Sequence, residues 1–253
     1  MSQYSDFAFV YDELMNEVDY DNWVKYIEDI IKSENVEVKN ILELACGTGN
    51  LTIPLTKKNY DIAAIDISEE MLQVAREKAE KENVELVLLE QDIVELDFDV
   101  PILDCILCGC DGFNYITYDE DLEGVFVKCH ELLKENGIFI FDISSYYKLS
   151  TVLGNNMYGE NRENISYMWQ NYFDDYENLV EMDLAFFVRG EDGRFDKFEE
   201  NHLQRAYKNE EVIDLLKNAG FDYIKTYGDF TFENPKKDSE RVFFVCKKQQ
   251  MEG

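Results

Sequence analysis

Two glycines and an acid have the spacing of a nucleoside-binding turn. The run ILELACGTGN, residues 41–50, passes from an apolar strand pattern into a turn that contains Gly47 and Gly49. Asp66 follows at the end of the next apolar run. Glycine lets backbone N–H groups approach a ligand, and an acid at the tip of the second strand can accept both hydroxyls of an adenosine ribose. The pattern therefore predicts a site for a nucleoside cofactor.

The residue that opens the following helix helps to choose between cofactors. Dinucleotide sites carry a third glycine at that place, whereas this chain has Thr52. NAD is therefore the weaker interpretation. An NAD-linked oxidoreductase and a non-catalytic cofactor-binding module stay open as alternatives, because a fold alone does not imply chemistry.

Strand and helix patterns alternate around this turn. Ser68 can cap a helix that runs through SEEMLQVAREKAEKEN, and further helices are expected over about 121–134 and 209–220. Apolar strand patterns lie at 40–45, 60–66, 84–90, 103–108, 137–143, 221–227 and 241–246. This alternation predicts an α/β fold, in which a Rossmann-like, doubly wound, seven-stranded and mostly parallel sheet has helices on both faces.

Two segments do not belong to this alternating pattern. Residues 1–36 predict N-terminal helices that cover one end of the sheet, including one with Trp23 and Ile27 on its apolar face. Residues 148–207 carry strand patterns at 167–172, 179–189 and 195–207, which predict an inserted antiparallel β lid. The cofactor-binding domain would then comprise residues 37–147 and 208–253.

The glycine turn resembles the first motif of class I S-adenosylmethionine-dependent methyltransferases. That motif is an acid followed by alternating small residues, here Glu43, Ala45, Gly47 and Gly49, with Ala45 in place of the usual first glycine. The resemblance implies that S-adenosyl-L-methionine is the cofactor. It also implies that Asp92 binds the adenine amino group, that Ile93 and Met71 cover the two faces of the ring, and that Asp66 and Ile67 belong to the same site.

Within this superfamily the chain is most similar to the glycine N-methyltransferase group and related small-molecule N-methyltransferases. This likeness implies that Tyr4 and Tyr11 close over the methionine portion of the cofactor and that the backbone of Gly109 meets its amine. Two arginines of the group are missing: none stands near Asn16 to Val18, and Ser144 occupies the place of the arginine that holds the substrate carboxylate. Glycine is therefore a poor candidate substrate.

Methyl transfer needs an acceptor lone pair that is held in line and shielded from water. Asp111 could hold an acceptor ammonium, and Tyr115 could orient or deprotonate it. Strand alternation places His202 on the face opposite Arg205, and we expect His202 at the surface and Arg205 in the functional role. The polar residues expected around the acceptor are Asp111, Asn114, Tyr115, Tyr146, His202, Arg205 and Tyr207.

Three cysteines, Cys105, Cys108 and Cys110, together with Cys129 and His130, superficially resemble a metal-ligand set. However, Cys105 and Cys108 lie in one strand pattern and should point to opposite faces. We therefore expect no metal site, and no disulfides.

Composition limits the partners of this protein. Its 253 residues include 54 acidic and 24 basic side chains, a net charge of −30, which disfavours nucleic acid and anionic membranes as partners. The beginning of the chain is not a secretory signal and no apolar run is long enough to span a bilayer, so a cytoplasmic location is expected. We expect a small-molecule methyl acceptor as the partner and a monomer or homodimer as the assembly.

Overall fold

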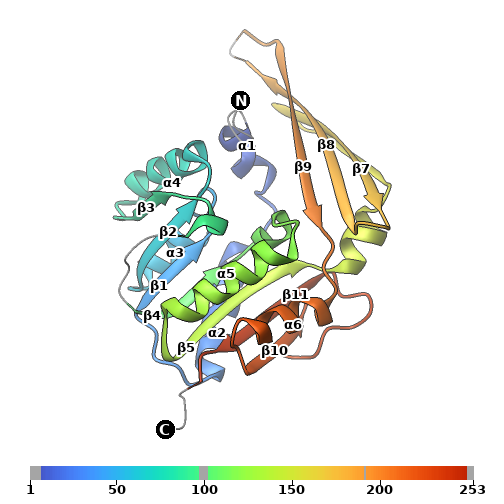
Figure 1. The fold of residues 1–253 in the computed structure, drawn as a ribbon. Helices are drawn as coiled ribbons and strands as arrows, with labels where there is room; N and C mark the ends of the chain where they lie inside the picture. Colours follow the sequence, from blue (N-terminus) through green and yellow to red (C-terminus); the bar gives the residue numbers. More distant parts are fainter. Residues whose placement is uncertain (1–6, 97–101, 191, 250–253) are drawn as a thin grey trace.

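A computed structural model describes residues 7–96, 102–190 and 192–249 of this chain. A seven-stranded sheet forms its centre, in the order β10-β11-β5-β4-β1-β2-β3. Neighbouring strands pair in parallel except β11, which is antiparallel to both β5 and β10. The expected seven-stranded, mostly parallel sheet is confirmed (Figure 1). Its strands are β1 (Asn40–Leu44), β2 (Asp61–Asp66), β3 (Val87–Glu90), β4 (Leu103–Cys108), β5 (Leu133–Ser144), β10 (Tyr223–Gly228) and β11 (Arg241–Lys247).

Helices cover both faces of this sheet. On one face, α2 (Tyr20–Ser33), α3 (Thr52–Lys57) and α4 (Glu69–Glu82) contribute to a core that includes Trp23, Ile27 and Leu72. On the other face, α5 (Asp119–Leu132) and α6 (Asn209–Asn218) bury Phe126 and Leu216. The cap expected for α4 is present, because the hydroxyl of Ser68 accepts the Met71 N–H at 3.2 Å.

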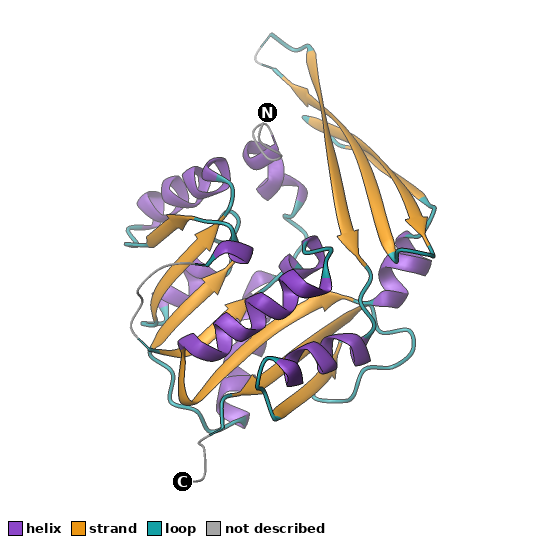
Figure 2. Ribbon diagram, in the orientation of Figure 1, coloured by secondary structure: helices purple, strands orange, loops and turns teal. Residues whose placement is uncertain are grey.

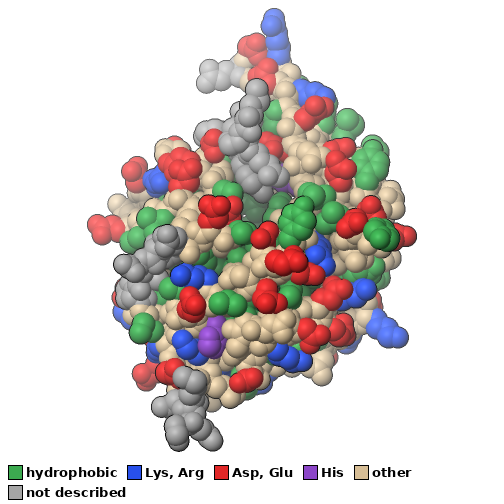
Figure 3. Space-filling view, in the orientation of Figure 1, with side chains coloured by type: hydrophobic (Ala, Val, Ile, Leu, Met, Phe, Trp, Pro, Cys, Tyr) green, Lys and Arg blue, Asp and Glu red, His purple; other side chains and the backbone are tan. Residues whose placement is uncertain are grey.

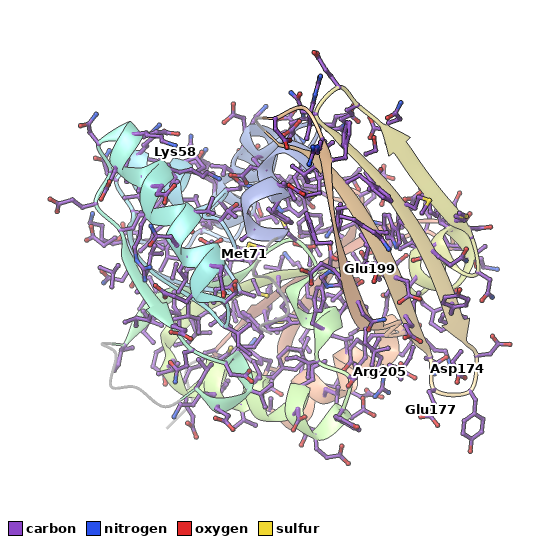
Figure 4. All side chains as sticks on the ribbon, turned by 90° about the horizontal axis from the view of Figure 1, so that it is seen from above. Lys58, Met71, Asp174, Glu177, Glu199 and Arg205 are labelled. Atoms are coloured by element: carbon purple, nitrogen blue, oxygen red, sulfur yellow. The ribbon has the colours of Figure 1, made fainter. Side chains whose placement is uncertain are left out.

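The two N-terminal helices have different places. The helix α2 packs on a face of the sheet rather than over its end. The short helix α1 (Phe7–Leu14) stands apart from it, between α4 and the inserted strands, as the view from above shows (Figure 4). The expectation that both helices cover one end of the sheet is therefore wrong for α2.

The insert is an antiparallel sheet that rises from the carboxyl end of β5 (Figure 2). It contains β6 (Met157–Asn161), β7 (Ile165–Asp174), β8 (Leu179–Arg189) and β9 (Phe195–Arg205) in that order. Three of these strands were expected. The edge strand β6 and the helical turn η3 (Lys148–Leu153) were not, because MYGEN is a polar run without strand-like alternation.

We use the word lid for β6 to β9 and call inner the lid face that carries His202 and Gln204. Val180 and Met182 on this face pack against Leu149 of η3. Farther along, Ile165 and Phe186 pack against Val10 of α1. The lid is thus anchored at its base by η3 and along its length by α1. No helix among the described residues is both long and apolar enough to cross a membrane.

Candidate active site

The turn between β1 and α3 runs through three left-handed residues. Gly47 and Gly49 have φ values of 54° and 75°, which glycine adopts without strain. Ala45 has a φ of 53° as well. Alanine in place of glycine therefore affects the backbone and not only the space around the cofactor. A residue with a Cβ adopts the left-handed conformation at a conformational cost of about 1–2 kcal/mol.

Asp66 ends β2 directly beside this turn. Its Oδ2 accepts the Gly47 N–H at 2.7 Å, and its Oδ1 accepts the Ser68 N–H at 3.0 Å. The side chain is buried, and burial raises its pKa above the ordinary value. Each carboxylate oxygen has a second lone pair. Asp66 therefore fixes the turn and keeps acceptor capacity for the two hydroxyls of a ribose.

Glu43 lies beneath the same turn, fully enclosed. It accepts a hydrogen bond from the Thr52 hydroxyl at 2.7 Å and so connects β1 to the start of α3. Burial, with a smaller contribution from the charge of Asp66, raises the pKa of Glu43 to about 7. Any effect of Glu43 on the expected cofactor would therefore come through the shape and charge of the turn.

The expected adenine-binding residues follow β2 and β3. Ile67 is 57% exposed although it adjoins the buried Asp66, so it offers an uncovered apolar surface. Met71 is buried at the start of α4 (Figure 4), and Ile93 is half-buried against the core. The carboxylate of Asp92 caps the turn η1 (Ile93–Glu95), where it accepts the Val94 N–H at 2.9 Å. An apolar surface and a nearby acid fit the adenosine portion of the expected cofactor.

Gly109 follows β4 and packs closely against α3. A Cβ at this position would lie 2.4 Å from Cδ1 of Leu51, so only glycine fits without displacement. Cys110 and Asp111 come next in left-handed conformations, with φ values of 56° and 55°. Their N–H groups donate to the two oxygens of Asp142 on β5, each at 3.0 Å. A buried carboxylate thus determines the course of the chain after Gly109.

A charged cluster surrounds this second turn. Arg241 of β11 pairs with Asp142 and also with Asp111, at 2.8 Å from Oδ1 of the latter. Its guanidinium lies 4.8 Å from the ring centre of Trp23. The other oxygen of Asp111 accepts a hydrogen bond from Gln204 of the lid at 3.3 Å. Asp111 therefore joins the lid to the turn, and Arg241 holds its pKa below the ordinary value despite burial.

Three residues of this cluster, Asp142, Arg241 and Gln204, were not among those expected from the sequence. Asp142 and Arg241 stand in otherwise apolar strand runs, and this was the signal that could have found them. Charged residues inside such runs are rare unless they are paired.

His202 is buried, and the prediction that it lies at the surface is wrong. The side chain is 3% exposed on the inner lid face, and its ring lies 5.9 Å from that of Tyr115, edge to face. Burial lowers the pKa of His202 to about 4, so the imidazole is neutral at physiological pH. Tyr115, in the turn η2 (Gly112–Tyr115), is 39% exposed. Both residues therefore face the region between the sheet and the lid.

Arg205 points the other way. Its guanidinium donates to the Thr117 carbonyl at 3.0 Å and pairs with Asp119 at 3.0 Å, which attaches the end of β9 to the start of α5. Asn114 bonds to the backbone of Ser144 and Arg205, and the Tyr207 hydroxyl donates to the Ile116 carbonyl. These contacts hold the lid against the sheet. Tyr146 is half-buried, 6.2 Å from the ring of Phe173.

The helix α1 covers the cofactor turn. One oxygen of Asp12 accepts hydrogen bonds from the Thr48 hydroxyl at 2.7 Å and the Asn50 amide at 3.0 Å, and the other pairs with Lys78 of α4 at 2.7 Å. The pKa of Tyr11 is raised, first by burial and then by Cys110, Tyr20, Tyr115 and Asp111 around it. Tyr11 thus lies close to the second turn, and its closure over the methionine portion of the cofactor stays a prediction. Tyr4 lies outside the described residues.

Cys105 and Cys108 point to opposite faces of β4, as their positions in one strand pattern predicted. Cys105 and Cys108 are buried in the cores on opposite faces of the sheet, and all six thiols are free. In the part of the chain that the structure describes, no three His, Cys, Asp or Glu residues are grouped to hold a metal ion. The expected absence of a metal stays a prediction, which elemental analysis of purified protein would test.

A glycine turn, an acid at the tip of β2 and a strand order with β11 reversed define the architecture of class I methyltransferases. Residues 41–137 match the methyltransferase domain family. A protein of Geobacillus sp. (strain WCH70) that is described as a methyltransferase is 38% identical over 97% of this chain and 99% of its own. The crystal structure of an S-adenosylmethionine-dependent methyltransferase from Clostridium acetobutylicum superimposes with a TM-score of 0.88, at 38% identity and coverage of 98% and 99%.

The chain belongs to the S-adenosylmethionine-dependent methyltransferases. It is an enzyme of the methyltransferase class rather than an NAD-linked oxidoreductase or a non-catalytic module. A glycine/sarcosine N-methyltransferase from Aphanothece halophytica is 27% identical over 83% of this chain and 76% of its own.

Proposed function

We propose that this protein transfers the methyl group of S-adenosylmethionine to a nitrogen or oxygen of a small molecule bound between η2 and the inner lid face. One observation carries the proposal. Asp66 holds the glycine turn at the carboxyl edge of the sheet, where a nucleoside would bind, and the inner lid face with His202 adjoins that edge through Gln204 and Asp111.

The bound cofactor would supply an electrophilic methyl group on a sulfonium. Gly47, Gly49, Asp66 and Gly109 would hold it, by the arrangement of their backbones and by the free lone pairs of Asp66. Tyr115 and the neutral His202 would orient the acceptor, and the lid would exclude water. Asp111 would hold an acceptor ammonium while it also binds Arg241 and Gln204.

Nitrogen is the favoured acceptor atom. The relative from Aphanothece halophytica is named for N-methylation, and the acidic character of this chain favours cationic ligands. Ser144, in the place of the carboxylate-binding arginine, is buried and donates its N–H to Asn114. It provides no positive charge for an amino-acid substrate.

A panel of acceptors tests this function. Purified protein would be incubated with methyl-labelled S-adenosylmethionine and with small amines, alcohols, phenols and glycine. We expect label in one or more amines without a carboxylate and none in glycine. Reaction without any added acceptor is the background control. Transfer to alcohols or phenols alone would contradict the preference for nitrogen, and no transfer to any member would contradict the proposal for this range of acceptors.

A further inference from the structure

The charges around the seat for the methionine portion do not balance. Asp111 and Asp142 share the single guanidinium of Arg241. Asp142 is 1% exposed, and burial raises its pKa, but Arg241 and two backbone N–H groups favour its ionised form against this effect. Two carboxylates on one guanidinium leave a surplus negative charge directly after Gly109.

Other charged groups act on the same region from neighbouring elements. Lys148 of η3 is a second cation acting on Asp111. Glu43 from β1 acts on the Cys110 thiol, and Asp66 from β2 acts on Glu43. Asp12 and Lys78 pair with each other and cancel. Arg241 and Lys148 thus lie among four carboxylates, those of Glu43, Asp66, Asp111 and Asp142. With the three aspartates ionised, the net charge of these six groups is −2 when Glu43 is ionised and −1 when it is protonated.

We propose that this surplus charge makes the seat select its ligand by charge, so that Asp111 and Asp142 favour the sulfonium form of the cofactor over the neutral thioether left after transfer. The inference rests on the proposed function. Asp142 Oδ1 lies 4.0 Å from the Cβ position of Gly109, the residue whose backbone is expected to meet the cofactor amine. The amine is common to both forms of the ligand, whereas the sulfur, three carbon atoms away from it, carries a charge only in the sulfonium, so the surplus charge acts on the two forms differently through the sulfur.

The reaction itself removes the charge that the seat favours. The acceptor lone pair forms a new bond to the methyl carbon while the sulfur–carbon bond breaks and leaves its electron pair on sulfur. The positive charge passes to the acceptor nitrogen, which becomes neutral again when it loses a proton to water. The neutral thioether then lacks the attraction that held the sulfonium, and this lowers the affinity for the spent cofactor.

The variant Asp111→Asn tests this inference by calorimetry. Asparagine tolerates the left-handed φ of 55° and keeps an oxygen for Arg241, so it removes one charge at little structural cost. Affinities for S-adenosylmethionine and S-adenosylhomocysteine would be measured for both proteins. We expect the variant to lose affinity for the sulfonium on the order of tenfold more than affinity for the thioether. Asp119→Asn removes another arginine-paired carboxylate, at the start of α5, and should leave the ratio of affinities unchanged.

A second variant covers the case in which Asp111→Asn fails to fold. Glu43→Gln keeps an acceptor for the Thr52 hydroxyl, and at pH 8.5 it removes a charge that is then present. It should shift the ratio in the same direction. If the wild-type protein binds both ligands and neither variant changes their ratio, the inference is wrong while the proposed function stands. If the wild-type protein binds neither ligand, both are wrong.

Discussion

Two acids of one site, Glu43 and Asp66, share a turn but differ in their surroundings. Burial raises the pKa of Asp66, and the two backbone N–H groups that it accepts limit this rise. Glu43 has one neutral hydroxyl as its donor, and its pKa rises to about 7. The carboxylate that is expected to meet the cofactor is thus the better stabilised as an anion.

This difference predicts a pH dependence of stability. The folded-state pKa of Glu43 is raised, so the folded protein holds a proton that the unfolded chain releases. The contribution of Glu43 is present below about pH 4.5 and is lost as pH rises through about 7. We expect the free energy of unfolding of the wild-type protein, relative to Glu43→Gln, to fall by about 3 kcal/mol between these values.

Urea denaturation of both proteins across this pH range measures the effect. A constant difference between them would show that the pKa of Glu43 is the same in the folded and the unfolded protein.

For single residues, the sequence did not allow burial to be predicted. Alternation along β9 correctly placed His202 and Arg205 on opposite faces. Which face is inward depends on α1, η2 and η3, which pack there from distant parts of the chain. The positions of Gly47, Gly49 and Asp66 in one turn could be predicted, because they depend on local backbone geometry; their contacts with the cofactor stay a prediction.

Among the elements, α1 contacts both sides of the site. Val10 packs on the lid, Tyr11 lies beside Cys110 and Asp111, and Asp12 binds the cofactor turn and Lys78. One short helix therefore touches the cofactor seat, the second turn and the lid (Figure 4). Its stability comes from these contacts, since a helix of 8 residues is marginal alone.

Asp12→Ala should release α1 from the cofactor turn. The change removes two hydrogen bonds and an ion pair, so we expect faster proteolysis near residues 7–19 and faster dissociation of S-adenosylmethionine. Limited proteolysis and stopped-flow binding would measure these rates. Glu13→Ala, on the exposed side of the same helix, is the matched control. Equal rates in the two variants would show that the contacts of Asp12 do not hold α1 in place.

The βαβ core was predictable at this scale, and part of the insert was not. Strands β4 and β8 have the expected bounds because an apolar run or an alternating pattern ends at clear breaks. Strand β6 is short and polar, and its pairing with β7 supplies the order that its sequence lacks.

At the scale of the whole molecule, the sheet and the lid meet along the carboxyl edge, and acidic side chains are spread over the face that Figure 3 shows. Bonds that involve Gln204, Asn114 and Arg205 attach the lid to the segment between β4 and α5. The expected cofactor residues lie outside the insert, and His202 lies within it. The two ligands of the proposed reaction would therefore be held by different parts of the chain.

Replacing residues 150–206 by a short Gly/Ser linker should separate these roles. We expect methyl transfer to be lost and most cofactor affinity to remain, because Gly47, Gly49 and Asp66 are untouched. Turnover and calorimetry measure the two properties, and sedimentation shows whether the lid instead forms a dimer interface. Full turnover by a monomeric truncated protein would show that the lid does not form the acceptor site.

The central claim is that Asp66 and the glycine turn bind S-adenosylmethionine, and titration calorimetry of Asp66→Ala tests it most directly. Loss of two charge-assisted hydrogen bonds to the ribose should weaken binding by roughly 2–4 kcal/mol. Circular dichroism would verify the fold, and Glu69→Ala, an exposed acid three residues later that pairs with Arg76, should bind as the wild-type protein does. Unchanged affinity in Asp66→Ala would contradict the claim.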